Sequence, residues 1–469
     1  MMQQEDCAAN ASNTLQEEFE NSIKLDVQDR IREMRTQKWQ EFLKQKTNSW
    51  TTAVSNLNVI LPQAKNKTPF HTLVPLDVEG IRIKKVVVEG DCGLEVTVAD
   101  DYKSFAIDGI PVLKDATAAM DVLVVVEYCH NDLPDLKLPP LKLKMSVNPL
   151  PKDLWRDLPV PENIEYPKRN EECEWINATM EGNKTVIAAS KRGRSHAHEG
   201  KPRDDHFSIN ITEDGWFVLV VADGAGSAPF SREGSRIACE TTNKICVNQL
   251  ADKHERLEQM IKNYVECDGQ KEKDSWRKKV GDLLYACLAT AAYIVHSDIK
   301  GVAKAKQRLP KDYATTLLMA IAKKMDGYWF VGSFNIGDGA IGLYNATDNS
   351  VKLLCEPDEG EFSGQTRFVT MNDMFMSATN IYMRLRFQIV NDFSSLMLMS
   401  DGVSDVYFET ENNLKDAEHW KVLERDILLA TNPGKRGDVS TETQAKRLLS
   451  WLDFWSPGNH DDRTIVVLH

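Results

Sequence analysis

Residues 218–226 read VLVVADGAG, and this stretch decides the fold of the larger part of the chain. Its β-branched and aliphatic residues indicate a buried strand that ends directly at Asp223. Gly224 and Gly226 then allow a sharp turn, because glycine has no Cβ. A carboxylate at the mouth of a buried strand suits a hard cation, but an aspartate-glycine pair is also a common turn signal. This stretch alone leaves both interpretations open.

Four further stretches place acidic residues beside a strand. They read KPRDDHFSI at 201–209, YWFVGSFNIGD at 328–338, FSSLMLMSDGVSD at 393–405 and HDDRTIVVLH at 460–469. The acidic residues at these strand ends are Asp204, Asp205, Asp338, Asp401, Asp405, Asp461 and Asp462. Carboxylates that meet in one cleft repel one another strongly unless cations neutralise them. The repeated pattern therefore predicts a site for divalent cations.

The motifs DD, DGAGS, ATTL, GDG, SDGVSD and DDRT follow one another in this order. Together they resemble the motifs of the metal-dependent PP2C-type Ser/Thr protein phosphatases, in particular their bacterial branch. The resemblance covers roughly residues 177–469. It implies an α+β fold, an α-β-β-α sandwich in which two antiparallel sheets pack face to face between helices. Periodicity alone predicts only the α+β class.

The same resemblance implies a phosphatase that hydrolyses phosphoserine and phosphothreonine. Two Mn²⁺ or Mg²⁺ ions, with a looser third, would activate a water molecule for attack on phosphorus. Asp223 would bridge two ions, and Gly224 would offer its carbonyl oxygen. The remaining implied ligands are Asp401 and Asp461 for one ion, Asp204 and Asp205 for the other, directly or through water, and Asp338 and Asp405 for the third. Asp462 is implied as a supporting hydrogen-bond acceptor.

Some positions depart from the family pattern. Asp204 stands where Glu or Gln is usual, and Ala225 stands where some relatives carry a histidine that donates a proton. His206 and His460 are sequence neighbours of the implied metal ligands Asp205 and Asp461. Neighbouring residues on a strand face opposite ways, so neither histidine is assigned as a general acid. Arg194 is the candidate for gripping phosphate, because its planar guanidinium matches phosphate oxygens. Arg203 and His196 are alternatives for that role, and a solvated surface role stays equally open for all three. Asp223, Asp205 and Arg194 are the predicted catalytic residues.

The chain as a whole has 469 residues, so two or three domains are expected. Its net charge of −13 argues against nucleic acid and anionic membranes as partners. We find no apolar run that approaches the roughly 18 residues of a membrane span, and no signal peptide. The nine cysteines lack CxxC spacing, which fits reduced thiols. We therefore expect a cytoplasmic protein.

Four segments are predicted: a helical segment at 1–52, an immunoglobulin-like β-sandwich at 53–148, a Pro-rich linker at 149–176 and the phosphatase-like domain at 177–469. Apolar residues recur every four positions between Leu15 and Ile31, which predicts an amphipathic helix or helix pair. This helix either packs on its own chain or docks a partner. We expect a charged helix end and exposed loop at about 254–278, and a mobile flap at 356–392.

A phosphorylated Ser/Thr protein is the expected substrate, with a cognate kinase as a further partner. A binding protein is the competing class: a pseudophosphatase or a phosphoprotein-binding scaffold that acts through the N-terminal helix and the β module. The presence of all the core metal acids favours the enzyme.

Overall fold

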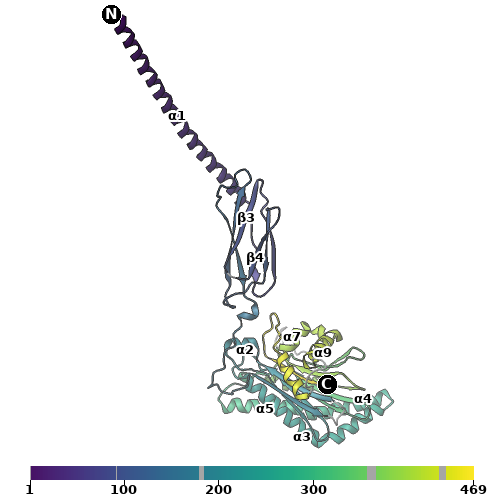
Figure 1. The fold of residues 1–469 in the computed structure, drawn as a ribbon. Helices are drawn as coiled ribbons and strands as arrows, with labels where there is room; N and C mark the ends of the chain where they lie inside the picture. Colours follow the sequence, from purple (N-terminus) through teal and green to yellow (C-terminus); the bar gives the residue numbers. More distant parts are fainter. Residues whose placement is uncertain (1, 91, 179–183, 356–365, 433–439) are drawn as a thin grey trace. The chain divides into compact units, whose positions relative to one another are not determined.

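A computed structural model describes residues 2–90, 92–178, 184–355, 366–432 and 440–469. The chain divides into two compact units, Met1–Leu154 and Trp155–His469. Figure 1 follows the chain from one unit to the other. Residues 356–365 of the expected flap lie outside the described residues.

The first unit begins with a single helix, α1 (Met2–Ser55), where a helical segment was predicted at 1–52. Its last turns pack on the core of the β module, where Val54 is buried and Trp50 contacts the cluster. From residue 14 to residue 42, by contrast, all its side chains are exposed. Within the described part of the first unit, this part of the helix therefore packs on no other element.

The rest of the first unit is all β, as predicted. One sheet has the strand order β1-β7-β6-β3 and the other β2-β5-β4. The strands are β1 (Ala64–Lys65), β2 (Phe70–Pro75), β3 (Ile81–Glu89), β4 (Leu94–Val98), β5 (Ser104–Gly109), β6 (Met120–His130) and β7 (Leu141–Asn148), and a short 3-10 helix, η1 (Pro151–Leu154), ends the unit. Phe105, Ile107 and Val124 are fully buried between the two sheets. The likeness of this module to an immunoglobulin domain stays a prediction.

The second unit is built on two antiparallel sheets, in the orders β10-β11-β12-β13-β16 and β15-β14-β17-β18-β9-β8. The first contains β10 (His206–Ile211), β11 (Phe217–Ala222), β12 (Leu317–Lys324), β13 (Trp329–Ile336) and β16 (Leu385–Val390). The second contains β8 (Glu171–Ala178), β9 (Lys184–Lys191), β14 (Ala340–Asn345), β15 (Ser350–Leu353), β17 (Ser395–Met399) and β18 (Arg463–Leu468). All six residues of β11 are buried. Because this central strand is covered on both faces, its sequence is apolar along its whole length.

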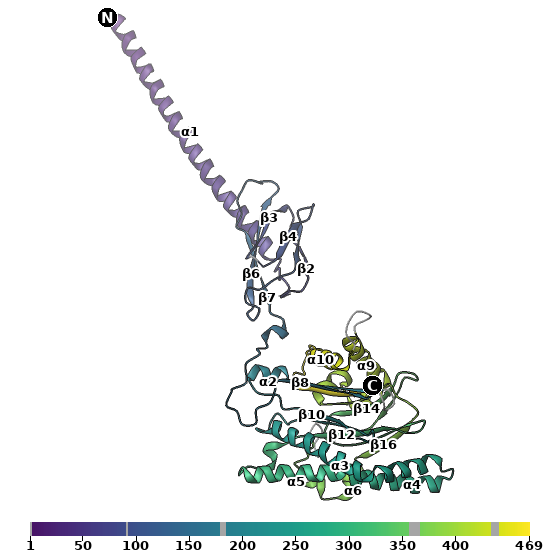
Figure 2. The same ribbon diagram turned by 60° about the horizontal axis from the view of Figure 1, so that its bottom comes forward.

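Helices cover the outer face of each sheet (Figure 2). The first sheet is covered by α3 (Ser231–Glu266), α4 (Gln270–Leu284) and α5 (Thr290–Ala305), and the second by α9 (Ala417–Thr431) and α10 (Thr441–Trp451). The shorter helices are α2 (Arg194–Glu199), α6 (Ala378–Tyr382), α7 (Asp401–Phe408), α8 (Glu411–Leu414), η2 (Tyr285–Ala289), η3 (Pro310–Tyr313) and η4 (Asn372–Phe375). This arrangement confirms the predicted α-β-β-α sandwich.

The prediction for residues 254–278 needs correction. The charged stretch at 254–278 is mostly helical, because α3 continues to Glu266 and α4 begins at Gln270.

Among the described residues, the helical stretch Gln270–Ala305 is long and apolar enough to cross a membrane by length and composition. However, 61% of its apolar window is buried inside the protein, where Leu284, Val295 and Ile299 join the core. The stretch therefore has the character of core helices.

Candidate metal centre

The register of the first sheet brings several predicted site residues to one edge. His206 of β10 pairs with Ala222 of β11, which sets the acids before β10 beside Asp223 after β11. Leu317 of β12 pairs with Ile336 of β13, which sets the start of β12 beside the turn that leads to Asp338. Asp204, Asp205, Asp223 and Asp338 therefore stand at the same end of this sheet.

The second sheet brings the remaining predicted acids to its own corresponding edge. Ala340 of β14 pairs with Met399 of β17, so Asp401 follows β17 next to the start of β14. Arg463 of β18 pairs with Lys191 of β9, so Asp461 and Asp462 stand just before β18 at this edge.

Two glycines show how closely the loops pack within each edge. A Cβ at Gly224 would lie 2.8 Å from the carbonyl oxygen of Asp204, and a Cβ at Gly402 would collide with the carbonyl oxygen of Asp462. Backbone from separate loops thus passes at these positions with room only for a hydrogen atom. The glycines of the DG motifs therefore serve close packing of the site loops.

Asp205 is held at one oxygen and left open at the other. It is 1% exposed, and its Oδ2 accepts hydrogen bonds from Ser400 Oγ at 2.8 Å and from Thr464 Oγ1 at 2.7 Å. Within the described part of the chain, its Oδ1 is buried and has no hydrogen-bond partner, and the same holds for Oδ1 of Asp401. Buried polar atoms are normally paired, so these two oxygens are available to a ligand.

Asp223 is fixed through its backbone, which leaves its carboxylate for other tasks. Its N–H donates to Thr316 Oγ1 at 2.9 Å, and its carbonyl oxygen accepts from the Thr316 N–H and from Thr315 Oγ1, both at 2.8 Å. The carboxyl groups of Asp223 and Asp401 lie within hydrogen-bonding reach of each other. The ATTL motif thus supplies the support for the central aspartate.

The carboxylates of this cluster resist ionisation when no cation is bound. Burial and then the charge of Asp401 hold the pKa of Asp223 well above its ordinary value, and burial raises that of Asp401. Burial and the charge of Asp462 raise the pKa of Asp205 to about 7 and that of Asp204 to about 6. Burial, followed by the charge of Asp462, also raises the pKa of Asp461. Buried acids that repel one another are the donor set that hard divalent cations require.

Asp462 ties the loops together. Its Oδ1 accepts from the Gly193 N–H at 2.6 Å, and its Oδ2 accepts from the Asp204 N–H at 2.5 Å. His196 Nδ1 lies 3.1 Å from Asp462 Oδ1, and His196 Nε2 lies 3.7 Å from Asp204 Oδ2. Although burial alone would lower it, the hydrogen bond and charge of Asp462 raise the pKa of His196 to about 9. His196 is thus a cation that neutralises part of the acidic cluster.

One oxygen or nitrogen from each of His196, Asp461 and Asp462 also falls within 4.8 Å of the others, a spacing compatible with a metal ion. Part of Asp461 is in contact with solvent although its carboxyl lies among the other acids, whereas its two neighbours in this group are buried. Asp461 is therefore the member of the group that reaches the open side of the site.

The outer acids are less enclosed. Asp338, between β13 and β14, accepts a hydrogen bond from Thr366 Oγ1. Asp405 lies one turn into α7 from Asp401. The residue as a whole is exposed, but the partial burial of its carboxyl and then the charge of Asp338 raise its pKa to about 6. These two acids stay predicted ligands of a further ion.

The candidates for the phosphate-binding cation have distinct environments. Arg194 begins α2 and donates to the backbone oxygen and to Oδ1 of Asp453, at 2.9 and 3.1 Å, while its guanidinium lies 5.5 Å from the centre of the Trp455 ring. Arg203 is fully buried and donates to the Ser190 backbone oxygen and to Glu172. The side chain of Arg194 is 29% exposed, whereas those of His196 and Arg203 are buried, so Arg194 stays the candidate.

The histidines beside the acids behave differently from each other. Burial, assisted by the charge of Lys168, lowers the pKa of His206 to about 2, so its ring is neutral. His460 instead packs between Trp155 and Trp455, with ring centres at 4.4 and 5.1 Å. Trp155 thereby ties the start of the second unit to the loop that carries Asp461.

Several supporting residues were given no role in the sequence analysis, although Thr315 and Thr316 belong to its ATTL motif. Ser400 and Thr464 hold Asp205, Thr315 and Thr316 hold Asp223, and Lys168 Nζ lies 3.3 Å from the carbonyl oxygen of Asp204. Ser400 and Thr464 directly adjoin the SDG and DDR motifs, so their positions were the available signal. Lys168 comes from the predicted linker and has no such signal.

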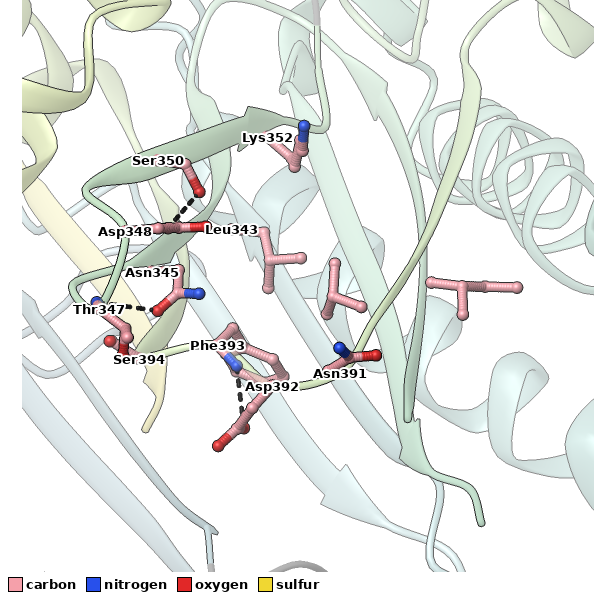
Figure 3. A pocket seen from close by; sticks show the side chains of 12 residues that line it. Leu343, Asn345, Thr347, Asp348, Ser350, Lys352, Asn391, Asp392, Phe393 and Ser394 are labelled. Atoms are coloured by element: carbon pink, nitrogen blue, oxygen red, sulfur yellow. Dashed lines mark hydrogen bonds between the residues drawn. The ribbon is translucent and has the colours of Figure 1, made fainter. Parts of the chain in front are cut away.

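Figure 3 shows a separate pocket of about 590 Å³. It lies at the end of β14 that is opposite to the end beside Asp401. Asn345 ends β14 there, and residues 389–394 form the other wall. Asp348 accepts from Ser350 Oγ at 2.6 Å, and Asn345 Oδ1 accepts from the Thr347 N–H at 3.0 Å. None of the predicted site residues lines this pocket, so it is separate from the cluster of carboxylates described above.

Comparison with known protein families supports the interpretation of this carboxylate cluster as a metal centre. Residues 192–452 match the family described as Protein phosphatase 2C. No curated protein matches the chain.

Similar solved structures include the serine-threonine phosphatase 2C from Toxoplasma gondii, at 14% identity and a TM-score of 0.39, over 64% of this chain and 98% of that one. The S. agalactiae serine/threonine phosphatase has 12% identity and a TM-score of 0.34, over 64% and 99%. The catalytic domain of the serine threonine protein phosphatase PstP, in complex with two manganese ions, has 18% identity and a TM-score of 0.33, over 61% and 97%. The assignment rests on the family match alone: since it spans more than half of the chain, the chain belongs to the protein phosphatase 2C family.

Proposed function

We propose that this protein is a metal-dependent phosphatase that removes phosphate from phosphoserine and phosphothreonine in proteins. One observation carries the proposal: separate loops of two sheets bring their carboxylates together, and two of the buried oxygens, Oδ1 of Asp205 and Oδ1 of Asp401, have no hydrogen-bond partner in the described part of the chain. Family membership supports the same activity.

The donor set fits Mn²⁺ or Mg²⁺, which prefer carboxylate and carbonyl oxygens. Asp223 would stand between two ions, with Asp401 and Asp461 on one side and Asp204, Asp205 and the Gly224 carbonyl on the other. Bound there, the ions would supply an activated water and neutralise charge on the phosphoryl group. Asp338 and Asp405 would serve a weaker third ion.

The chain's own groups orient this site. Ser400 and Thr464 hold Asp205 in one rotamer, and the pair Thr315–Thr316 fixes the backbone of Asp223. Asp462 joins the loops of Gly193 and Asp204. We assign Arg194, at the rim beside Trp455, to bind the phosphate of the substrate. These contacts pre-organise the site before substrate arrives.

Release of phosphate from a phosphoserine or phosphothreonine peptide tests the proposal. We expect turnover with Mn²⁺, loss of turnover with EDTA, and a loss of at least about 100-fold in kcat for Asp223→Asn. Asp348→Asn is the matched control, since Asp348 lies in the distant pocket of Figure 3 and should leave kcat unchanged.

The competing pseudophosphatase would bind the phosphopeptide with no release of phosphate under any metal. Tight binding of the peptide to the Mn²⁺-loaded wild-type chain without turnover would therefore overturn our proposal. We further propose that the protein acts in the reducing cytoplasm, because the eight cysteines whose side chains are described are all free.

A further inference from the structure

Residues 155–170, which precede β8, pack along the loops of the metal centre. We call this stretch the entry segment. The ring of Trp155 lies 4.4 Å from that of His460, in the loop that leads to β18. The Leu158 N–H donates to the carbonyl oxygen of Ala197 in α2 at 2.8 Å. This part of the predicted linker is therefore built into the second unit.

The second half of the entry segment is clamped onto neighbouring elements. Glu165 forms ion pairs with Arg308 at 2.6 Å and with Lys306 at 3.2 Å. Arg232, in the first turn of α3, donates from its Nε to the carbonyl oxygen of Tyr166 at 2.9 Å. The backbone on the approach to β8 is thus held in place against α3 and the loop after α5.

This clamp presents the amine of Lys168 to the main chain of the acidic site. Lys168 Nζ donates to the carbonyl oxygen of Asp204 at 3.3 Å, to that of Arg232 at 3.2 Å, and to Ser235 Oγ at 3.0 Å. A lysine ammonium has three donors, and three acceptors surround it here. Ser235 Oγ is also a hydrogen-bond donor to the carbonyl oxygen of Asp204. Two side chains thus converge on one carbonyl oxygen.

The carbonyl oxygen of Asp204 occupies a tightly packed place among the proposed metal ligands. A Cβ at Gly224 would lie 2.8 Å from it, so the two loops are in direct contact there. The N–H of the same residue donates to Asp462 Oδ2 at 2.5 Å. A movement of this carbonyl oxygen would therefore displace both the carboxylate of Asp204 and the backbone of Gly224.

We propose that Lys168 is a positioning residue of the metal centre. It fixes the main chain of Asp204 and, through it, the donors of the ion assigned to Asp204, Asp205 and the Gly224 carbonyl. The entry segment is then part of the site, although it precedes the residues that match the family. This inference rests on the proposed metal-dependent function. Groups that orient metal ligands in this way typically contribute 10- to 100-fold to metal affinity.

Titration calorimetry of the full chain with Mn²⁺ tests the proposal. Lys168→Met removes the amine and keeps a side chain of similar length. We expect one of the two Mn²⁺ binding steps to weaken at least about 10-fold and the other to stay unchanged.

Ser235→Ala removes the second donor to the same oxygen and should weaken the same step. The double variant should depart from the product of the two single effects, because both groups act on one atom.

Lys184→Met is the matched control, because Lys184 is also a lysine with a buried amine. It is 8% exposed and donates to the carbonyl oxygen of Phe393 at 2.7 Å, at the end of β9 away from Lys191 and the acidic edge. Its loss should lower the free energy of unfolding and leave both Mn²⁺ binding steps unchanged. Equal weakening of Mn²⁺ binding in Lys184→Met would overturn the proposal, since general stability would then explain the effect of Lys168.

The proposal is equally overturned if Lys168→Met and Ser235→Ala both bind Mn²⁺ as the wild-type chain does. Should Lys168→Met fail to fold, Ser235→Ala and the control decide the matter. Phosphate release is recorded separately: a wild-type chain that binds Mn²⁺ without turnover refutes the phosphatase activity, while the titrations still decide the role of Lys168. A wild-type chain that binds no Mn²⁺ refutes both.

Discussion

Asp205 receives two hydroxyl hydrogen bonds, from the residue after β17 and from the second residue of β18. Residues that orient a metal-binding carboxylate typically contribute 10- to 100-fold to metal affinity. We therefore expect Ser400→Ala to raise the Mn²⁺ concentration that gives half-maximal activity by about 10-fold, with a smaller effect on kcat at saturating Mn²⁺. A metal titration of activity measures this shift.

Ser395→Ala is the matched control for Ser400→Ala. Ser395 lies at the other end of the same strand, is 1% exposed, and donates to Glu424 at 2.8 Å. Its loss should lower stability in a similar way while leaving the Mn²⁺ dependence unchanged. Equal shifts of the Mn²⁺ dependence in both variants would show that the strand, and not the bond to Asp205, sets metal affinity.

The close approach at Gly402 leads to a second prediction at this scale. Gly402→Ala places a methyl group against the carbonyl oxygen of Asp462, whereas Gly226→Ala meets no atom within 4 Å. Forcing a methyl group into a packed site commonly costs about 1–3 kcal/mol. The free energy of unfolding should fall by that amount for Gly402→Ala only, which denaturant unfolding followed by fluorescence of the second unit can measure. An equal loss in Gly226→Ala would contradict the packing role.

Single residues also show what could be predicted from the sequence. Asp223 and Asp401 stand out because each directly follows an apolar strand and precedes a glycine. The pairing of Arg194 with Asp453 was not foreseeable, because the two residues are 259 positions apart and no local pattern links them. Local patterns identify the chemistry of a position, whereas its partners depend on the tertiary fold.

At the scale of elements, the strands were easier to predict than the long helix α3. β11 is apolar along its full length, so its pattern is unmistakable. The second half of α3 is dominated by charged residues, and only Leu250, Leu257 and Ile261 of its inner face are fully buried there. A narrow buried stripe within a charged sequence looks like a loop until a partner surface is known.

The buried stripe of α3 makes a testable element-level prediction. Ile261 is 0% exposed in the core beneath the first sheet, so Ile261→Ala leaves a cavity there. Such truncations cost about 2–5 kcal/mol, and we expect a loss in this range for the second unit. Glu255→Ala, on the exposed side of the same helix, should change stability by less than about 0.5 kcal/mol in the same urea titration. Similar losses in both variants would contradict the buried stripe.

At the scale of the whole molecule, the two compact units should unfold separately. All the proposed metal ligands lie in Trp155–His469, so Mn²⁺ should raise the midpoint of only one of two thermal transitions. At a free Mn²⁺ concentration 100 times the dissociation constant, the gain is about 2.7 kcal/mol. Calorimetry with and without Mn²⁺ measures it, and a shift of both transitions, or of neither, would contradict the assignment of the site.

The acidic cluster also predicts how the metal-free second unit responds to pH. Asp204 and Asp205, whose pKa values are about 6 and 7, hold protons in the folded state that they release near pH 3.8 when unfolded. The folded state thus binds more protons across this window, so stability falls as pH rises from about 4 to 7. His196 adds to the fall, because its pKa of about 9 exceeds the ordinary 6.5 and its contribution is lost as pH rises through 9. Two groups act the other way: His206, whose pKa of about 2 lies below the ordinary 6.5, opposes the fall up to about pH 6.5, and Asp462, whose pKa is lowered, does so only near and below its ordinary 3.8. The raised carboxyl groups outnumber them, so the net slope stays negative.

The measurement is urea unfolding of the second unit in EDTA between pH 5 and 8. Stability should decrease steadily with pH in EDTA, and saturating Mn²⁺ should flatten or reverse this slope, because the ions replace the protons that the carboxylates would otherwise hold. Asp205→Asn should reduce the slope in EDTA, since it removes the group with the highest of the two values, whereas Asp348→Asn should leave it unchanged. A metal-free slope of zero, or one that survives saturating Mn²⁺ intact, would mean that protons and cations do not compete for the same carboxylates.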